Sequence, residues 1–443
     1  MSSAETFIAA AIWHGGLEKA NAILAAEPGL ARRSIFTAAV LGDEDSIRSC
    51  LAADPAAASA VSPPYGATAL VYLCFSNYLR LDPAWTPAFV RAAALLLDAG
   101  ADPNGGFRSS GEHPEWESAI YGAAGVAHNA ALTRLLLERG ADPNDDETAY
   151  HAAETYDNGA MHALVESGRL QAPGLSTLLL RKTDWHDYQG IKWLLERGVA
   201  ANAATRWGKT ALHNAVLSDN RLAIVELLLE HGADPLAIAT RPERGSSRRG
   251  AQTAVQMAAR RGRGDALQAF AARGVSIELE GIEQLLAACA RHDIVAVRSI
   301  AASAPQVVKE LQADGARFLA WFSGVDNADG VRLLLDLGVP VDARFVEGEG
   351  YFDEAPHSLA IHVASWRASH ATLRLLIARG SPINAPDGHG RTPLMLAVKA
   401  CVDSYWAGRR SPESVKALLD AGASIEGLSI PSGYADVDAL LAR

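Results

Sequence analysis

The chain has 443 residues, of which 49% are hydrophobic, so it contains enough apolar material for a large buried core. Its formal net charge of −11 at pH 7 argues against broad, nonspecific binding to nucleic acids or to anionic membranes. The four cysteines (50, 74, 289 and 401) lie far apart without metal-site spacing, which indicates small buried side chains in a reducing compartment. The apolar run at residues 7–13 is too short for a signal peptide and no later stretch could span a membrane, so we expect a cytoplasmic protein.

Taken in chain order, the sequence predicts about twelve helix–turn–helix units. Two degenerate units come first, at about 8–30 and 35–58, and a third degenerate unit covers about 285–308. Clearer units open with a short recurring motif at Thr68, Ser118, Thr148, Thr253, Leu359 and Thr392. A short final helix is expected near residues 434–441.

The clearest unit begins at Gly208 with the run Gly-Lys-Thr-Ala-Leu-His-Asn-Ala. Its threonine is a helix N-cap, because a hydroxyl accepts a hydrogen bond from a free backbone N–H of the first turn. Leu212 and Ala215 then lie on one helix face, and Leu227 and Leu228 bury a second helix. Gly232 supplies the left-handed residue that ends this second helix.

This unit resembles the ankyrin repeat, with its Gly-x-Thr-Pro-Leu-His-x-Ala opening and its closing Gly-Ala-Asp. The closing glycine recurs at residues 100, 140, 198, 274, 338, 380 and 422. The resemblance covers nearly the whole chain and implies an all-α solenoid of stacked helix–turn–helix units with short hairpin tips. It further implies one continuous body over 1–443, with degenerate capping repeats in 1–60, repeats with insertions in 61–425 and a C-terminal cap in 426–443.

Five insertions interrupt the units, at residues 77–87, 104–117, 235–252, 344–357 and 402–412. Insertions of this kind gather on the faces where repeat proteins bind their partners. Trp116 stands in the second of them between carboxylates, where it either contacts a partner or packs back onto its own unit.

Two neighbouring units depart from the pair of small residues that ankyrin repeats carry where the first helix packs closely. The fifth unit has Glu154 after Ala153, and the sixth has Arg181 and Lys182. Three hypotheses account for these groups. They form a half-buried ion pair that holds the stack in register, or they line a polar pocket with Tyr150, His151 and His186, or they are simply exposed to solvent. All but the last hypothesis predict that they lie close together.

The histidines need separate interpretations. His151, His213 and His362 fall on the histidine of the motif, which in ankyrin repeats makes hydrogen bonds within the turn framework. His151 also has Glu147, Tyr150 and Glu154 as sequence neighbours, so a site role stays open for it. The Asp184-x-His186-Asp187 cluster has too few ligands to indicate a metal site, and we expect no metal and no cofactor.

The positions that follow each small pair are expected to face a groove. They are apolar or aromatic in the first half of the chain and basic in the second. The insertion at 235–252 adds further arginines to the basic half at 241, 244, 248 and 249. Carboxylates gather in the fourth and fifth units, at Asp142, Asp145, Asp146, Glu147, Glu154 and Asp157, so we expect a polarised concave surface.

The resemblance implies a binding scaffold that presents a concave groove to a protein or peptide with an acidic and an apolar segment, and we expect no membrane or nucleic-acid partner. The expected binding residues are Trp116, Tyr150, Tyr156, Arg181, Trp185, Arg260, Arg261, Arg291, Trp366 and Arg367.

The alternative is an enzyme of the hydrolase or lyase type, or a binder of a small anionic or sugar-like ligand, with a polar pocket in units four to six. Paired carboxylates there could serve acid–base chemistry. The candidate catalytic residues are Glu117, Tyr121, Glu147, His151, Glu154, Lys182, Asp184 and His186. Known catalytic motifs and phosphate-binding glycine loops are absent from the sequence, so the scaffold is the leading hypothesis.

Overall fold

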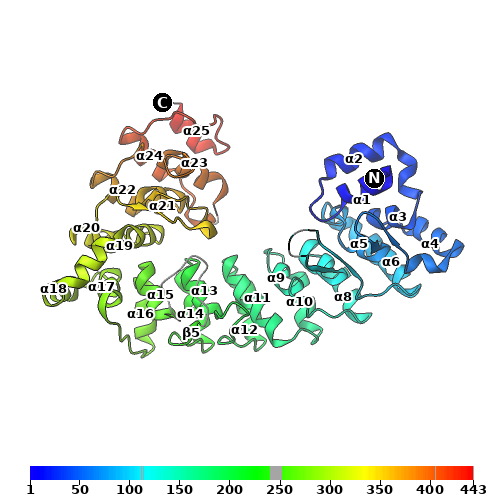
Figure 1. Cartoon of the computed structure of the whole chain (residues 1–443), viewed down its shortest axis with the longest axis horizontal. Helices are drawn as coiled ribbons and strands as arrows, with labels where there is room; N and C mark the ends of the chain where they lie inside the picture. The colour runs from blue at the N-terminus through cyan, green and yellow to red at the C-terminus, as the bar shows by residue number, and fades with distance from the viewer. Residues whose placement is uncertain (111, 113, 240–251, 405, 443) are drawn as a thin grey trace. The chain divides into compact units, whose positions relative to one another are not determined.

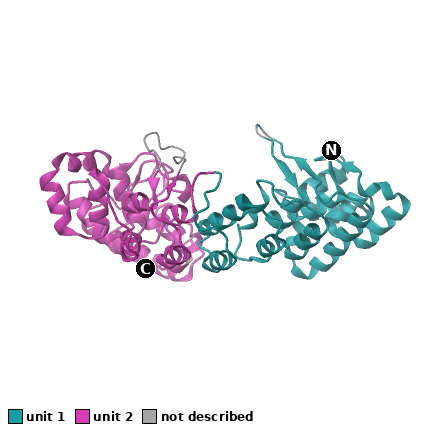
Figure 2. Ribbon diagram, turned by 90° about the horizontal axis from the view of Figure 1, so that it is seen from below, with its two compact units in different colours: residues 1–206 teal, residues 207–443 magenta. Residues whose placement is uncertain are grey.

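A computed structural model of the chain describes residues 1–110, 112, 114–239, 252–404 and 406–442. The chain divides into two compact units, unit 1 (Met1–Arg206) and unit 2 (Trp207–Arg443), coloured separately in Figure 2. Each unit is built from pairs of antiparallel helices joined by short turns (Figure 1). The single continuous body expected from the sequence stays a prediction.

In unit 1 the helices pair in chain order, and short helical turns fill the connections. The helices are α1 (Ser3–Ala11), α2 (Leu17–Ala26), α3 (Ile35–Leu41), α4 (Glu44–Ala53), α5 (Ala69–Cys74), α6 (Thr86–Asp98), α7 (Ala119–Tyr121), α8 (Ala130–Glu138), α9 (Thr148–Ala152), α10 (Gly159–Glu166), α11 (Ala172–Asp184) and α12 (Tyr188–Glu196). The turns are η1 (Pro28–Arg32), η2 (Pro55–Ala58), η3 (Asn77–Arg80), η4 (Pro83–Trp85) and the π-helical η5 (Gly122–Val126).

Unit 2 repeats the same pairing and ends in a short helix close to the expected place. Its helices are α13 (Ala211–Leu217), α14 (Leu222–Glu230), α15 (Ala254–Arg261), α16 (Gly264–Ala272), α17 (Gly281–Ala290), α18 (Ile294–Ser303), α19 (Pro305–Gly324), α20 (Ala328–Asp336), α21 (Ala360–Trp366), α22 (His370–Ala378), α23 (Pro393–Asp403), α24 (Glu413–Asp420) and α25 (Ala435–Leu441). Two helical turns, η6 (Gly350–Phe352) and η7 (Ala407–Arg409), lie in insertions. No described helix is long and apolar enough to cross a membrane.

The described strands form two-stranded antiparallel hairpins at repeat tips, as expected for the hairpin ends of such units. They pair as β1 (Val61–Ser62) with β2 (Ala67–Thr68), β3 (Gly106–Arg108) with β4 (Trp116–Ser118), β5 (Ile238–Ala239) with β6 (Gln252–Thr253), and β7 (Arg344–Phe345) with β8 (Ser358–Leu359). Phe107 pairs with Glu117 in the longest of them. The predicted arginine cluster at 241–249 lies outside the described residues.

The helix boundaries follow the capping chemistry predicted from the sequence. Thr210 accepts a hydrogen bond from the backbone N–H of His213, and Thr68, Thr253 and Thr392 cap their helices in the same way. The closing glycines all have left-handed backbones, at residues 100, 140, 198, 232, 274, 338, 380 and 422. The sequence therefore determines where most repeats close.

The core of each unit lies where the first helices of successive repeats meet. The small pairs Ala38–Ala39, Ala123–Ala124 and Ala258–Ala259 are completely buried. Neighbouring first helices, such as α9 and α11 or α13 and α15, pack against one another at these positions. Burial also raises the pKa of the Cys289 thiol to about 12. Cys74, Cys289 and Cys401 are buried as expected, whereas Cys50 is only half-buried, so the expectation is wrong for it.

The positions after the small pairs are mostly buried, so the expectation that they face a groove is wrong for most of them. Phe75, Leu217 and Arg367 are all covered, whereas Tyr156 is exposed. The first helix ends at this place and turns into the second helix, which packs the side chains between helices instead of toward solvent.

We expect the same substitution, glycine to alanine, to destabilise the fold by different amounts at two positions of one repeat. A Cβ at Gly262 would lie 2.5 Å from Cγ of the buried Phe322, whereas a Cβ at Gly274 meets no atom within 4 Å. Both residues have positive φ. We expect Gly262→Ala to lower the free energy of unfolding by about 3 kcal/mol and Gly274→Ala by about 1 kcal/mol, because only the first adds overpacking to backbone strain. Equal losses in urea unfolding would contradict this account.

Candidate functional site

The strongest polar cluster of unit 1 centres on His151, near the C-terminal end of α9. Its Nε2 lies 3.0 Å from Oε2 of Glu147, and its Nδ1 lies 2.7 Å from Oε2 of Glu154. Glu154 follows the end of α9, since this helix stops at Ala152 after only five residues. The early end lets the charged side chain leave the packing position that a small residue usually fills.

Arg181 of α11 extends this cluster into the next repeat. Its guanidinium forms ion pairs with Glu154 and with Asp184, and its Cζ lies 4.0 Å from the centre of the Tyr150 ring. The half-buried ion pair between Glu154 and Arg181 that the sequence suggested is therefore present. We call Glu147, Tyr150, His151, Glu154 and Arg181, with Asp184, the His151 network.

Lys182 belongs to a separate contact, although the sequence placed it with its neighbour Arg181. Its side chain is fully buried at a position where other repeats have alanine, and Nζ donates to the carbonyl oxygen of Thr155 at 2.5 Å. Nζ also lies 3.1 Å from Oδ2 of Asp187, which accepts a second hydrogen bond from Asn158. Burial lowers the pKa of Lys182, and the Asp187 carboxylate partly offsets that effect.

The charges of the network stabilise one another. Burial alone would lower the pKa of His151, but its hydrogen bonds to Glu147 and Glu154 outweigh burial and raise it to about 9. Burial tends to raise the pKa of Glu154, yet His151 and Arg181 lower it overall. At neutral pH the network therefore contains a protonated imidazole between two carboxylates.

Glu117 and Tyr121 lie beside this network in the preceding repeat. Glu117 is buried on β4, and burial together with the nearby Glu147 raises its pKa. The Tyr121 ring lies 5.2 Å from that of His151, and burial raises its pKa to about 12. Burial is the main cause of both shifts, and the nearby Glu147 adds to each of them. His186, a further candidate, is half-buried with a left-handed backbone at the turn after α11.

Two aromatic residues of the predicted binding set are exposed on unit 1. Trp116 on β4 is 42% exposed, and Tyr156 after α9 is 64% exposed. The Tyr156 ring meets that of Trp185 edge to face, with centres 5.6 Å apart. Arg108, on the paired strand, lies over Trp116 at 5.7 Å from its ring centre. The Trp116 ring lies against Gly106 of the paired strand, where a Cβ would be 2.8 Å from its Cε2 atom, and its other face is partly exposed.

The arginines of unit 2 have partners within their own chain. Arg261 is buried and binds Glu349 with both Nη atoms, at 2.7 and 2.5 Å. Arg367 is buried as well, and its Nε donates to Oε1 of Glu354 at 2.6 Å. Burial raises the pKa of Glu354 to about 7 in spite of Arg367. Both glutamates come from the insertion at 344–357, which folds onto the helices that carry the arginines.

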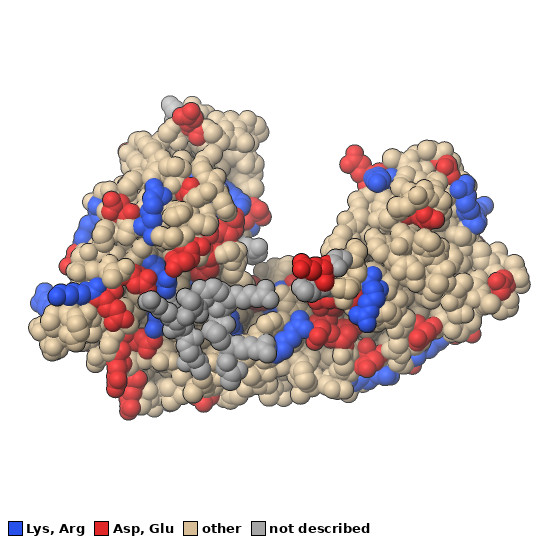
Figure 3. All heavy atoms as spheres, viewed as in Figure 1, with Lys and Arg blue, Asp and Glu red and all other residues tan. Residues whose placement is uncertain are grey.

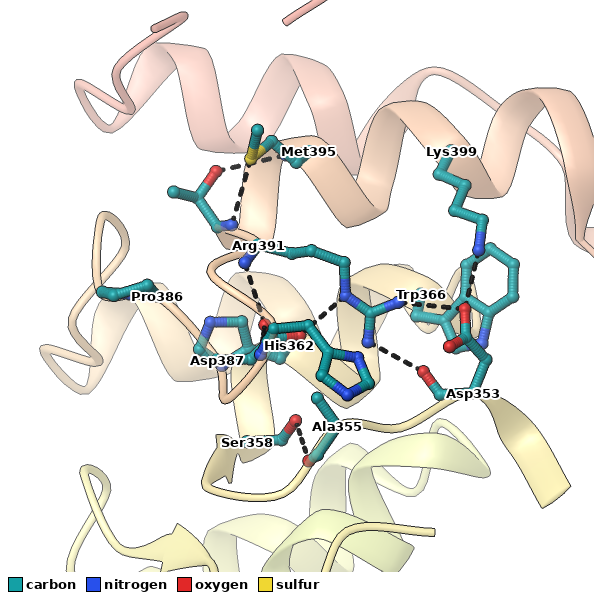
Figure 4. Close-up of polar contacts among 12 residues, drawn as sticks. Asp353, Ala355, Ser358, His362, Trp366, Pro386, Asp387, Arg391, Met395 and Lys399 are labelled. Carbon is teal, nitrogen blue, oxygen red and sulfur yellow. Dashed lines mark hydrogen bonds and ion pairs between the residues drawn. The ribbon is translucent and has the colours of Figure 1, made fainter. Parts of the chain in front are cut away.

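Figure 4 shows how the same insertion contacts the following repeat. Arg391 bridges Asp387 and Asp353, and Nζ of Lys399 lies 2.6 Å from Oδ2 of Asp353. Lys399 also lies 4.6 Å from the ring centre of the buried Trp366. The predicted binding residue Trp366 is therefore covered.

The expected basic half of a groove is not a free surface. Arg260 pairs with Glu283 at 2.7 Å, in addition to the two buried arginine pairs. Arg291 is half-buried and donates to the carbonyl oxygen of Ala287. In the view of Figure 3, acidic and basic side chains are interspersed over each unit. The partners Asp187, Glu283, Glu349 and Glu354 were not predicted, because Asp187 is in a turn, Glu283 is in the first turn of α17, the other two are in an insertion, and none has a motif position.

The described residues contain no group of three or more His, Cys, Asp or Glu side chains placed to hold a metal ion. The Asp184–Asp187 segment is instead divided between contacts. Asp184 pairs with Arg181, and Asp187 caps α12 by accepting from the backbone N–H of Gly190.

Comparisons with known proteins match parts of both units. A family model described as ankyrin repeats (three copies) matches residues 182–239, and the ankyrin repeat model matches residues 389–427. A relative named as an ankyrin repeat protein, from Rickettsia bellii, is 33% identical over 108 residues, which are 24% of this chain and 44% of the relative. The mitochondrial disaggregase of Bos taurus is 29% identical over 175 residues, or 38% of this chain and 21% of that protein.

A third relative, the 2-5A-dependent ribonuclease of Mus musculus, is 48% identical over 58 residues, or 13% of this chain and 8% of the enzyme. The chain thus spans less than half the length of each of these relatives. Among solved structures, the human ASB11 ankyrin repeat domain covers 56% of this chain and 98% of its own, with 20% identity and a TM-score of 0.24. The Bcl-3 ankyrin repeat domain covers 54% and 97%, with 21% identity and a TM-score of 0.23.

The buried lysine predicts a large stability effect. We expect Lys182→Met to lower the free energy of unfolding by about 3 kcal/mol, because it leaves the Asp187 carboxylate buried without its cation. The matched control is Lys192→Met, whose lysine is 45% exposed and 3.7 Å from Glu196. We expect a loss below about 0.5 kcal/mol there. If chemical unfolding shows similar losses for both variants, the buried pair of Lys182 and Asp187 does not have the structural role assigned to it.

We expect the contributions of two motif histidines to stability to depend on pH in opposite directions. The folded pKa of His151 rises from 6.5 to about 9, so the stability that it contributes is complete below pH 6.5 and is lost as pH rises through about 9. Burial lowers the pKa of His213, whose Nδ1 accepts from the backbone N–H of Thr210, so its contribution is lost as pH falls below 6.5. His151→Gln should therefore destabilise most in acid, and His213→Gln most at higher pH. Unfolding curves from pH 5 to 9.5 measure both trends, and parallel trends would refute the assignment.

Proposed function

Because the chain is an ankyrin-repeat protein, we propose that unit 1 binds a protein or peptide partner through its exposed aromatic residues beside the His151 network. Ankyrin repeats indicate a protein-interaction scaffold, and the proposal adds the surface and the chemistry of the partner. The observation that carries it is the exposure of Trp116 and Tyr156 in neighbouring repeats. Tyrosine and tryptophan contribute a large share of the binding energy in protein interfaces.

Both aromatic side chains have rigid support. Tyr156 rests against Trp185 of the next repeat, and Trp116 stands on a hairpin held by backbone pairing between β3 and β4. A side chain that is already ordered loses little conformational entropy when a partner covers it. This support favours a binding role over chance exposure.

The surroundings of these residues favour a cationic group in the partner. Glu112, Glu115 and Asp157 are exposed near them in sequence. Burial is the main cause of the raised pKa of Glu117, and the nearby Glu147 raises it further, while Glu147 and Glu154 raise the pKa of His151. We therefore propose a partner segment with apolar and basic side chains.

The acidic partner segment expected from the sequence has less support. That expectation depended on arginines such as Arg261 and Arg367, which are buried and paired with Glu349 and Glu354. An acidic peptide would have to displace these internal carboxylates before it could reach the guanidinium groups. The basic and apolar segment needs no such exchange at unit 1.

Acid–base catalysis by the His151 network is the weaker alternative. Both ring nitrogens of His151 are engaged by carboxylates, and Arg181 engages Glu154 and Asp184. A general acid or base needs a proton that it can exchange with a substrate near the working pH. With a pKa of about 9, His151 holds its proton firmly at neutral pH.

The test is a selection of random peptides displayed on phage against the full chain. We expect enrichment of peptides that combine aromatic or aliphatic side chains with lysine or arginine. Trp116→Ala and Tyr156→Ala should each weaken a selected peptide by about tenfold or more, with the melting temperature unchanged. Affinity should also fall with added salt, because the proposed charges are near the surface.

The matched control is Trp85→Ala. Trp85 has the same exposed fraction as Trp116, 42%, but lies at the start of α6, where its ring meets that of Tyr78. Peptide affinity should be unchanged in this variant. Enrichment of acidic peptides, or equal losses in the Trp85 and Trp116 variants, would overturn the proposed surface.

A further inference from the structure

A polar cavity of about 490 Å³ lies within unit 2, apart from the residues that the proposed partner surface uses. Its walls come from the turns between the first and second helices of four successive repeats, at residues 219–222, 262–265, 290–292 and 325–329. Arg409, from the insertion at 402–412, completes the lining. Side chains that are far apart in sequence thus meet at one place.

The strongest observation at this cavity is the buried guanidinium of Arg263. Its side chain is only 3% exposed, and Nε and Nη2 donate to the two carboxylate oxygens of Asp265 at 2.8 and 2.9 Å. The remaining Nη1 is buried and has no hydrogen-bond partner among the described residues. It lies 3.7 Å from Oδ1 of Asp219. A buried guanidinium N–H without an acceptor is costly, so this atom indicates a place for an anion or another acceptor.

The charge of the lining points the same way. Arg263, Arg291 and Arg409 line the cavity with three carboxylates, but Asp329 lies 2.6 Å from Arg332, which is outside the cavity, and 3.3 Å from His292. Asp219 lies between Arg263 and Arg409, at 3.7 and 3.1 Å, and so holds both guanidinium groups in position. Arg291 has no carboxylate partner in the described part of the chain. The cavity therefore carries excess positive charge.

Helix ends add to this potential. The second helices α14 and α16 begin at the cavity, with Arg221 and Arg263 as their N-cap residues. Neither helix has a side-chain hydrogen bond at its N-cap. At α16 the Asp265 carboxylate accepts from backbone N–H groups of the first turn, so the positive helix end that is open to an oxyanion is that of α14.

We propose that this cavity binds a phosphate group, either free phosphate or that of a small phosphate monoester. A phosphate dianion can accept hydrogen bonds from several arginines at once, whereas a single carboxylate offers only two oxygens. Its oxygens would satisfy Nη1 of Arg263 and engage Arg291. The volume leaves room for a small organic group beside the phosphate.

The test measures binding of inorganic phosphate and of O-phospho-L-serine to the full chain by calorimetry at constant ionic strength, with L-serine as the neutral control. We expect saturable binding of phosphate and no binding of serine. Arg291→Gln should weaken phosphate binding by about tenfold or more, since a charge-assisted hydrogen bond is lost. Arg409→Gln provides a second variant at the less buried edge of the cavity.

The control Arg298→Gln removes the same charge from an exposed residue of α18 outside the cavity, and it should leave affinity unchanged. Binding of phosphoserine as well as phosphate would assign a monoester site, and binding of inorganic phosphate alone would assign the free ion. No saturable binding, or equal weakening in the Arg291, Arg409 and Arg298 variants, would overturn the proposal.

Discussion

The close approach of successive first helices is the constraint on which the rest of each unit depends. Alanine pairs such as Ala258–Ala259 are completely buried because only small side chains fit between neighbouring helices at this distance. The stack then buries a continuous core that no single repeat could form alone. Each departure from a small residue must therefore be compensated by a change in local structure or by a specific partner.

Unit 1 contains both kinds of compensation in adjacent repeats. At Glu154 the helix ends early, so the carboxylate leaves the packing position and reaches His151 and Arg181. At Lys182 the helix continues to Asp184, and the buried ammonium group instead finds Asp187 and a carbonyl oxygen. A hydrophobic residue would fit such a position at lower electrostatic cost. The network is thus best understood as a polar core that also sets the potential of the nearby aromatic surface.

The sequence was informative wherever a local rule decides the structure. Thr210 at an N-cap and Gly232 at a helix end follow from hydrogen bonding and backbone geometry within a few residues, and both predictions are confirmed. The predicted proximity of Glu154 and Arg181 followed from repeat spacing. The burial of Arg261 and its ion pair could not be predicted, because its partner Glu349 is 88 residues away in an insertion that has no repeat position.

Insertions therefore decide which charges of such a protein are available to a ligand. The sequence placed Arg261 and Arg367 in the basic half of the expected groove, yet the insertion at 344–357 supplies a carboxylate to each of them. The nearby Trp366 is buried as well. At the turns between helices, Arg263 keeps one buried Nη1 atom without a hydrogen-bond partner among the described residues, and Arg291 lines the same cavity. A ligand for this unit is best sought among compact anions that can enter a cavity, instead of among extended acidic peptides.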